Sequence, residues 1–203
     1  MHTFMRQTGR MEYKGDIFYI GQVLEGNVNS FSHIVDRHKD HVFNLAVKIC
    51  GNREDAEEVA QDSFLKAFRS ISGFKMKSSF ATWLYRIVYN SAISHIRTRK
   101  REILSIEEFP ADASDFLSSF TDEEEALEQY RRSLVGFALQ KLSEEERAIV
   151  TLYYYEEMNT EKIAEVTGIS RQNVKVRLFR ARQKMSEIIQ NAEKKNIIYN
   201  EEN

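Results

Sequence analysis

Residues 80–101, FATWLYRIVYNSAISHIRTRKR, combine aromatic and basic side chains and include no Asp or Glu. A helix advances about 100° per residue, which aligns one indole with polar and cationic groups: Trp83, Arg86, Asn90, Ser94, Arg97 and Arg101. Guanidinium groups bind phosphates bidentately, and an indole can stack on an exposed base. This face is therefore suited to DNA whose strands are opening. The alternative is a solvated face on which Trp83 partly covers the core.

The same helix has two apolar stripes besides its polar face. The first contains Phe80, Leu84, Ile87, Val88 and Ser91, and the second contains Tyr85, Tyr89, Ile93 and Ile96. Because each stripe needs its own apolar neighbour, we expect this helix to pack on more than one side.

A second basic segment, TEKIAEVTGISRQNVKVRLFRARQK over residues 160–184, has the spacing of a helix-turn-helix. Gly168 supplies the tight turn and Ser170 caps the second helix. The outward face of that helix holds Gln172, Lys175, Val176, Phe179 and Arg180, flanked by Arg171, Arg177, Arg182 and Lys184. We expect its N-terminal part to read base edges and the flanking cations to hold phosphates. An ordinary helical hairpin is the alternative.

The net charge of −2 conceals a separation of the charges along the chain. Every charged side chain in residues 63–101 is Lys or Arg, every one in residues 102–128 is Asp or Glu, and residues 170–184 are again purely basic. An ordinary solvated surface mixes its signs. Two basic blocks therefore predict a polyanionic partner that the chain contacts twice.

The residues that could support catalysis do not form a recognisable site. Two sets of candidate metal ligands occur, acids on one helix face and histidines before them: Asp55, Glu58, Asp62, His33, His38 and His41. They lack a metal-ligand repeat, and the sequence has no phosphate-binding Gly-rich loop or nucleophile elbow. The single cysteine, Cys50, excludes an internal disulfide and a multi-thiolate site. We expect no enzyme, no metal, no cofactor and no small-molecule substrate.

The composition predicts an all-α fold, because the 203 residues include one Pro and eight Gly and no alternating run of β-branched residues. Helical periodicity and caps predict two small domains, 16–101 and 122–190, between a leader (1–15), an acidic linker (102–121) and a tail (191–203). Within them we expect helices at 16–24, 30–50, 53–72, 79–101, 122–141, from 143, 160–167 and 171–190. No apolar run is long enough to span a bilayer and no signal-peptide core follows the start, which predicts a cytoplasmic protein.

Three stretches carry a resemblance: DAEEVAQDSFLKAF from residue 55, SSFATWLYRIVYNSAISHIRTRKR from residue 78, and LSEEERAIVTLYYYEEMNTEKIAEVTGISRQNVKVRLFRARQKM from residue 142. Together with residues 31–51 they resemble conserved regions two and four of bacterial RNA polymerase sigma factors of the extracytoplasmic-function type. Several long motifs in the right order are more specific than any one of them.

The resemblance implies an N-terminal domain that binds the β′ clamp helices of core RNA polymerase and melts the −10 element of promoter DNA. It places the core-binding surface at Asp55, Glu58, Gln61, Asp62 and Phe64. The residues matched to −10 recognition, together with the polar face described above, are Lys75, Lys77, Ser78, Trp83, Arg86, Asn90, Arg97 and Arg101.

The resemblance also implies a C-terminal domain whose recognition helix enters the major groove of the −35 element and which touches the β flap. Its residues would be Ser170, Arg171, Gln172, Lys175, Val176, Arg177, Phe179, Arg180 and Arg182. Members of the family are usually held inactive by an anti-sigma factor, so such a partner is expected. The acidic linker would pass through the polymerase cleft, either as a nucleic-acid mimic or as a solvated tether.

The chain departs from the family pattern where bases would be read. Met76 and Lys77 stand where members often carry Gly and an acid, and Asn173 and Val176 stand where Thr and Ser are common. Ser143 replaces a frequent Pro. The promoter sequence is therefore not carried over from the family. A stand-alone helix-turn-helix regulator that binds duplex operator DNA remains the alternative function, although it leaves residues 55–68 and the Trp83 face without a role.

Overall fold

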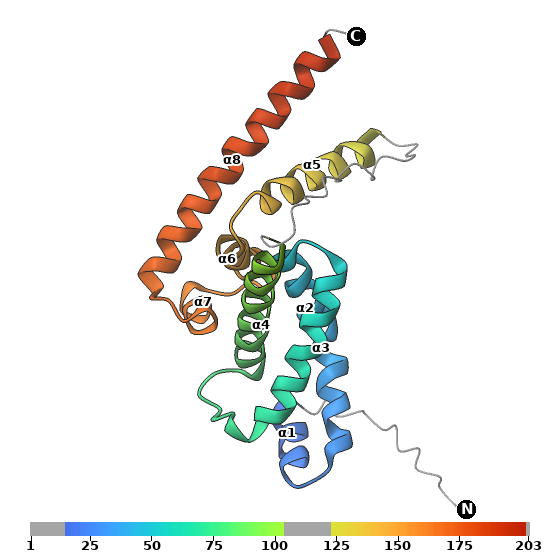
Figure 1. Cartoon of the computed structure of the whole chain (residues 1–203), viewed down its shortest axis with the longest axis vertical. Coiled ribbons are helices and arrows are strands. Elements are labelled where there is room, and N and C mark those ends of the chain that lie inside the picture. Colours follow the sequence, from blue (N-terminus) through green and yellow to red (C-terminus); the bar gives the residue numbers. More distant parts are fainter. Residues whose placement is uncertain (1–14, 104–122, 202–203) are drawn as a thin grey trace, which may run out of the picture.

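The computed structural model describes residues 15–103 and 123–201, and its regular elements within those ranges are all helical (Figure 1). We call the helices before residue 104 the N-terminal body and those after residue 122 the C-terminal body. The N-terminal body comprises α1 (Asp16–Leu24), η1 (Val28–Ser30), α2 (Phe31–Cys50), α3 (Arg53–Ser70), η2 (Ile71–Gly73) and α4 (Phe80–Ile103). The C-terminal body comprises α5 (Glu123–Gln140), α6 (Glu144–Tyr154), α7 (Thr160–Thr167) and α8 (Arg171–Glu201). The all-α prediction is confirmed.

Side-chain caps set several helix starts. Asn52 accepts a hydrogen bond from the Asp55 backbone N–H at 2.9 Å and so begins α3. Ser143 and Glu146 form a capping box at the start of α6, where a helix was expected from residue 143. Asn159 caps α7 by accepting from the Lys162 N–H at 2.9 Å. These contacts satisfy amide groups that have no partner within their own helix.

The first apolar stripe of α4 forms the centre of the N-terminal body. Phe80, Leu84 and Val88 are buried, and α4 packs against both α2 and α3. Ile34, Leu45 and Ile49 of α2 and Val59 of α3 are buried in the same core, which follows from their helical spacing.

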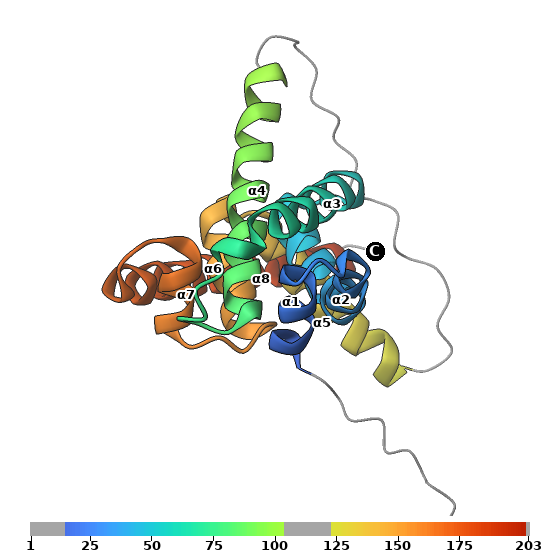
Figure 2. The same ribbon diagram turned by 90° about the horizontal axis from the view of Figure 1, so that it is seen from below.

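The second apolar stripe of α4 is buried by the C-terminal body. Tyr85, Tyr89 and Ile93 are at most 9% exposed, and α7 packs against α4 while α6 packs against α2. Figure 2 shows α4 standing between α3 and the α6–α7 pair. The expectation of a helix packed on two sides is confirmed. The two bodies therefore share one continuous apolar core.

Three helix ends differ from the sequence prediction by two residues or more, and the first is that of α3, which ends at Ser70 where residue 72 was expected. The helix α4 continues to Ile103, and α8 continues to Glu201, well beyond the expected end at residue 190. No Gly or Pro follows residue 190, so no residue there stops the helix. The expected leader (1–15) and the expected linker (102–121) lie mostly outside the described residues. No helix in the described part of the chain is long and apolar enough to cross a bilayer.

Replacing Gly168 by Ala tests the turn of the helix-turn-helix. Gly168 ends α7 with a φ of 74°, in the left-handed region that disfavours a Cβ atom. We expect Gly168→Ala to lower the free energy of unfolding by about 1 to 2 kcal/mol, measured by urea denaturation. Gly136→Ala is the control, since Gly136 lies exposed within α5 with open space at its Cβ. That change should stabilise the protein by about 0.5 to 1 kcal/mol. Equal changes in the free energy of unfolding for the two variants would contradict the left-handed turn assigned to Gly168.

Candidate nucleic-acid interface

The polar face of α4 is exposed except for its indole. Arg86, Asn90, Ser94 and Arg97 all reach solvent. The Trp83 ring is half-buried and lies 5.4 Å, centroid to centroid, from both Phe74 and Phe80. The indole therefore helps to close the core, and only part of its surface is exposed. The side chain of Arg101 lies outside the described part.

The loop before α4 presents further cations. The loop starts at Phe74, whose side chain is buried. It ends at Ser79, whose hydroxyl accepts a hydrogen bond from the Thr82 N–H at 3.2 Å at the start of α4. Between them Lys75, Met76 and Lys77 are exposed, and Ser78 is half-buried. Met76 has a φ of 53°, an uncommon conformation for a side chain of this size. The loop thus holds two cations and an apolar side chain out in solvent beside the polar face.

The first turns of α8 show the predicted division between buried and exposed residues. Val174, Leu178 and Ala181 are buried against the rest of the C-terminal body. The outward positions are all exposed: Gln172, Lys175, Val176, Phe179 and Arg180. Phe179 is 60% exposed, which costs free energy in water and fits an apolar contact in a groove. Ser170 caps the helix by accepting from the Asn173 N–H at 3.2 Å.

The three arginines that flank the outward face of α8 all have partners within the protein. Arg171 lies 2.8 Å from Glu161 and donates to Thr160 at 3.3 Å. Arg182 donates to the Tyr154 hydroxyl at 2.7 Å and its guanidinium lies over the rings of Tyr153 and Tyr154. These contacts connect the start of α8 to α7 and its middle to α6.

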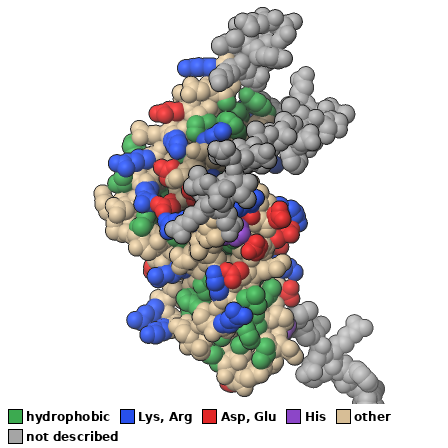
Figure 3. Space-filling view, in the orientation of Figure 1, with side chains coloured by type: hydrophobic (Ala, Val, Ile, Leu, Met, Phe, Trp, Pro, Cys, Tyr) green, Lys and Arg blue, Asp and Glu red, His purple; other side chains and the backbone are tan. Residues whose placement is uncertain are grey.

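The third arginine, Arg177, donates to Glu145 of α6 at 2.5 Å. Arg97 of the polar face of α4 donates to the other oxygen of the same carboxylate at 3.2 Å. The two basic blocks of the sequence therefore meet at one acidic residue. Figure 3 shows Lys and Arg along the left edge of the molecule with some acidic side chains among them, and a further group of acidic side chains on the right.

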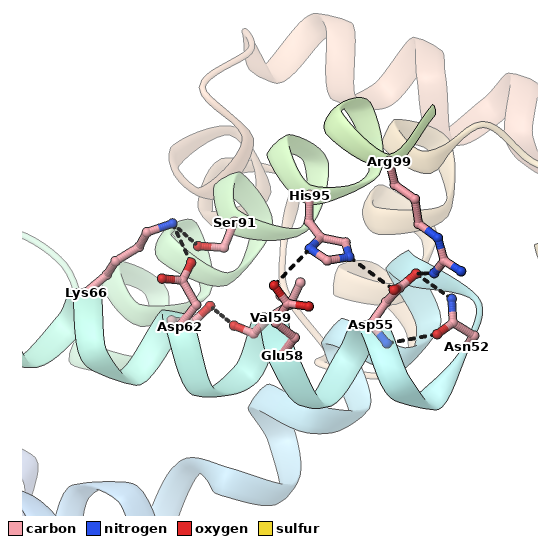
Figure 4. Close-up of polar contacts among 10 residues, drawn as sticks. Asn52, Asp55, Glu58, Val59, Asp62, Lys66, Ser91, His95 and Arg99 are labelled. Carbon is pink, nitrogen blue, oxygen red and sulfur yellow. Dashed lines mark hydrogen bonds and ion pairs between the residues drawn. The ribbon is translucent and has the colours of Figure 1, made fainter. Parts of the chain in front are cut away.

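Asp55 of α3 was predicted at a polymerase-binding surface. Its side chain lies between α3 and α4 (Figure 4). Its carboxylate accepts hydrogen bonds from Arg99 and, at 2.6 Å, from Asn52, and lies 3.1 Å from His95 Nε2. Burial by itself would raise the pKa of Asp55. The hydrogen bonds from Asn52 and Arg99 and the nearby His95 ring nevertheless hold that pKa below its ordinary value. This carboxylate faces α4 and joins the two helices.

The rest of the predicted α3 surface is accessible. Glu58 has a side chain 73% exposed, and Asp62 pairs with Lys66 at 2.5 Å (Figure 4). Gln61 and Phe64 line an apolar groove that α3 shares with η1 and α2, together with Val28, Phe31, Val35, Leu65 and Phe68. This groove was not predicted from the sequence. The available signal was Leu65, an apolar residue next to Lys66 on α3 that the structure leaves 54% exposed.

The histidines considered as metal ligands lie apart and contact separate partners. His33 stacks on Tyr19, His38 lies 3.1 Å from Asp16, and His41 lies 3.1 Å from Glu156. Within residues 15–103 and 123–201 no group of three or more His, Cys, Asp or Glu could hold a metal ion. The half-buried Cys50 thiol has its pKa raised to about 12 by burial and by nearby Asp55, so it stays protonated.

Comparison with protein families matches both bodies. Residues 34–102 match the family model Sigma-70 region 2, and residues 132–185 match Sigma-70, region 4. The first range contains the polar face of α4 and the acidic α3, and the second contains the helix-turn-helix.

Several curated proteins are similar along most of their length. The ECF RNA polymerase sigma-E factor of Haemophilus influenzae is 32% identical over 177 residues, covering 84% of this chain and 93% of that protein. The RNA polymerase sigma-H factor of Pseudomonas aeruginosa is 30% identical over 177 residues, covering 84% and 92%. The ECF RNA polymerase sigma factor SigW of Bacillus subtilis is 29% identical over 170 residues, covering 81% and 91%.

Solved structures share the arrangement of helices. CnrH, solved in complex with the cytosolic domain of CnrY, superposes with a TM-score of 0.61 at 25% identity, covering 87% of this chain and 97% of CnrH. The sigma factor RpoE of Bartonella quintana, solved with the anti-sigma factor NepR, gives a TM-score of 0.64 at 22% identity, covering 79% and 96%. The second likeness concerns the fold alone.

The Asp55 contact predicts a pH-dependent contribution to stability. Because its pKa is lowered in the folded state, the stabilisation is present above the unfolded pKa of about 4 and is lost as pH falls through the folded pKa. We expect Asp55→Asn to lower the free energy of unfolding by about 1 to 3 kcal/mol at pH 7, and by progressively less below about pH 4. Urea denaturation at several pH values measures this.

The control for this prediction is Asp36→Asn. The Asp36 side chain is 69% exposed and pairs only with Lys39 in the next turn. Its replacement should change stability by less than about 0.5 kcal/mol at every pH. A pH-independent effect of Asp55→Asn would contradict the role assigned to the carboxylate.

Proposed function

The chain belongs to the extracytoplasmic-function sigma factors of RNA polymerase, and we propose that its two helical bodies divide promoter recognition between them. A sigma factor binds core RNA polymerase and directs it to start transcription at specific promoters. The observation that supports the division is the pair of exposed cationic faces, one on α4 and one on α8, carried by different bodies.

The start of α8 is the proposed reader of the −35 element. Lys175 and Arg180 are exposed cations on its outward face, and Val176 and Phe179 offer apolar contacts of the kind made with thymine methyl groups. Arg171 is assigned a positioning role, because its contacts with Glu161 and Thr160 hold α8 against α7. Gln172 and Ser170 lie where a recognition helix first meets the groove.

The polar face of α4 and the loop before it form the proposed −10 surface. Asn90 and Arg86 are exposed side by side along the helix, and the loop adds Lys75 and Lys77. Cations bind the phosphates of the strand, while Asn90 can donate to and accept from a base edge. The partly buried Trp83 can present an edge of its ring to an unpaired base.

Two apolar grooves are proposed for core polymerase. The groove beside Gln61 and Phe64, with Glu58 and Asp62 near it, is assigned to the β′ clamp helices. A second groove between α5, α6 and α8 contains Val135, Tyr154 and Met185 and is assigned to the β flap. Exposed apolar side chains such as Leu65 and Tyr154, which are 54% and 53% exposed, support both assignments because a partner would bury them.

The remaining parts of the proposal follow from family membership. The chain would act by binding, without catalysing a reaction of its own, in the cytoplasm where core polymerase is found. An anti-sigma factor is proposed as its regulator, as NepR accompanies RpoE in the solved complex.

In vitro transcription tests this proposal. Purified bacterial core polymerase is incubated with and without the protein on the DNA upstream of its own gene. We expect a discrete run-off transcript that appears only when the protein is present. A protein that yields no transcript but binds the duplex tightly by itself in a gel shift would instead be a helix-turn-helix regulator.

Lys175→Ala tests the assignment of α8. Loss of a base contact should weaken −35-dependent initiation by about 1 to 3 kcal/mol, and loss of a phosphate contact should lower the salt slope of promoter binding by about 1. The matched control is Lys194→Ala, an exposed lysine much further along the same helix. Equal run-off yields from both variants at raised salt would show that this face does not read the promoter.

A further inference from the structure

The first helix, α1, lies outside the residues matched to the Sigma-70 region 2 model, since that match begins at residue 34. It packs against η1, against α2 and against η2, which leads directly into the loop before α4. In Figure 1, α1 lies at the lower end of the N-terminal body, beside that loop. Its buried side chains, Ile20 and Val23, belong to the main core. The helix is therefore placed to support the surface that we assign to the −10 element.

Two buried phenylalanines hold the ends of the loop of residues 75–79. Phe74 precedes this loop, and Phe80 is the first residue of α4. Their ring centroids lie 5.5 Å apart and the rings meet edge to face at 85°, an arrangement that aromatic rings prefer. The Trp83 ring lies 5.4 Å from each of them. A shift of this aromatic cluster, Phe74, Phe80 and Trp83, would therefore move the loop and the indole together.

His38 of α2 packs against the aromatic cluster. Its side chain is 9% exposed, and its ring centroid lies 5.6 Å from that of Phe80. Its Nε2 atom lies 3.1 Å from Oδ2 of Asp16, in the first turn of α1. A carboxylate only accepts hydrogen bonds, so Nε2 donates and the bond fixes the orientation of the imidazole. His38 thus connects α1 to the ring that begins α4.

Asp16 also binds the residue before His38. Its Oδ1 atom accepts from Arg37 Nη1 at 2.7 Å. The Arg37 guanidinium lies 5.7 Å from the Tyr19 ring centroid, and the Tyr19 ring stacks on that of His33 at 4.5 Å. The Asp16 side chain is 21% exposed, so salt screens its contacts less than those of a fully exposed ion pair. Together these contacts attach α1 to α2.

We propose that Asp16 and His38 are positioning residues for the −10 surface. They hold α1 and the aromatic cluster in the arrangement from which the loop of residues 75–79 and Trp83 face the opening strands. The inference rests on the proposed function, since that function assigns this loop to the −10 element. Neither residue needs to touch DNA, because the effect of both passes through Phe80.

The backbone of the loop gives a reason for this support. Met76 has a φ of 53°, a conformation that costs free energy for a residue with a side chain and persists only where the surrounding structure holds it. Phe74 and Phe80 hold the loop from its two ends, and the His38 ring packs on the second of them. We therefore expect loss of the Asp16 carboxylate to loosen the loop while the N-terminal body stays folded.

Asp16→Asn tests the proposal, because it keeps the shape of the side chain but removes its charge and one acceptor oxygen. The matched control is Asp36→Asn, the same change at a 69% exposed position that pairs with Lys39. The chain contains one Trp, so indole fluorescence reports directly on the aromatic cluster. We expect Asp16→Asn, and not Asp36→Asn, to shift the Trp83 emission of the free protein to the red, as water gains access to the indole.

The same variants are then compared with core polymerase on the promoter fragment that gives the run-off transcript. Affinity for core polymerase and for the closed promoter should match wild type, because Asp16 lies neither on α8 nor in the lining of the groove beside Phe64. Permanganate reactivity of thymines in the −10 element should appear roughly three- to tenfold more slowly with Asp16→Asn. Slower opening at unchanged closed-complex affinity is the result that a positioning role requires.

A loss of stability by itself is tested with Ile49→Val. This change removes one methylene from a fully buried side chain about three turns further along α2 than His38, and so destabilises the same body at a distance from Asp16. If Ile49→Val shifts the emission and slows opening as Asp16→Asn does, the effect comes from general destabilisation and the proposal is overturned. An Asp16→Asn protein that equals wild type in both quantities also overturns it.

His38→Gln tests the route through the imidazole. It keeps an N–H donor for Asp16 but removes the ring beside Phe80, so it should shift the emission and slow opening as well. Adding Asp16→Asn to His38→Gln should change little further, because both residues act through the same contact. Fully additive effects would contradict the route through His38.

Run-off transcription with the wild-type protein separates this inference from the proposed function. If wild type yields no transcript, the proposed function fails whatever the emission shows. If wild type initiates, while Asp16→Asn matches Asp36→Asn in emission and in the rate of opening, only the positioning role of Asp16 and His38 is rejected.

Discussion

The burial of α4 on two sides is the constraint on which the rest of the structure depends. One apolar stripe packs on α2 and α3, and the other packs under the C-terminal body, so a single wedge of the helix is left for polar groups. That wedge carries Arg86, Asn90 and Arg97 at nearly fixed positions, because the backbone that holds them is packed on both sides. The DNA-binding surface that we propose on this wedge would need little ordering when it binds, which preserves affinity.

The distribution of charge follows from the same packing. Arg97 pairs with Glu145 of the other body, and Arg177 pairs with the same carboxylate within its own body, whereas Lys175, Arg180 and Arg86 stay exposed. On α3 the buried Asp55 joins two helices, while Gln61, Phe64 and Leu65 line an apolar groove. A single-sign block in the sequence therefore contains a residue that joins the two bodies, Arg97, as well as cations that we assign to a polyanionic partner. The separation of charges along the sequence does not tell these two roles apart, because a guanidinium binds a carboxylate as readily as a phosphate.

Local signals predicted the helices well, since caps and apolar periodicity depend only on residues close together in the chain. The helix start near residue 143, the turn at Gly168 and the exposed outward face of α8 all lie where the sequence placed them. Helix ends without a breaking residue were less predictable, and α8 runs on to Glu201. The expected linker lies mostly outside the described residues, so its role as a nucleic-acid mimic or a solvated tether stays a prediction.

The sequence by itself determined the class of the fold, the two basic faces and the resemblance that family comparison then confirmed. These depend on residue type and spacing along one helix, which the chain carries explicitly. Only the tertiary structure decided that Asp55 faces α4, that Trp83 closes the core, and that Glu145 joins Arg97 to Arg177. Such contacts connect residues distant in the chain, and their partners depend on how whole helices pack, which no local pattern records.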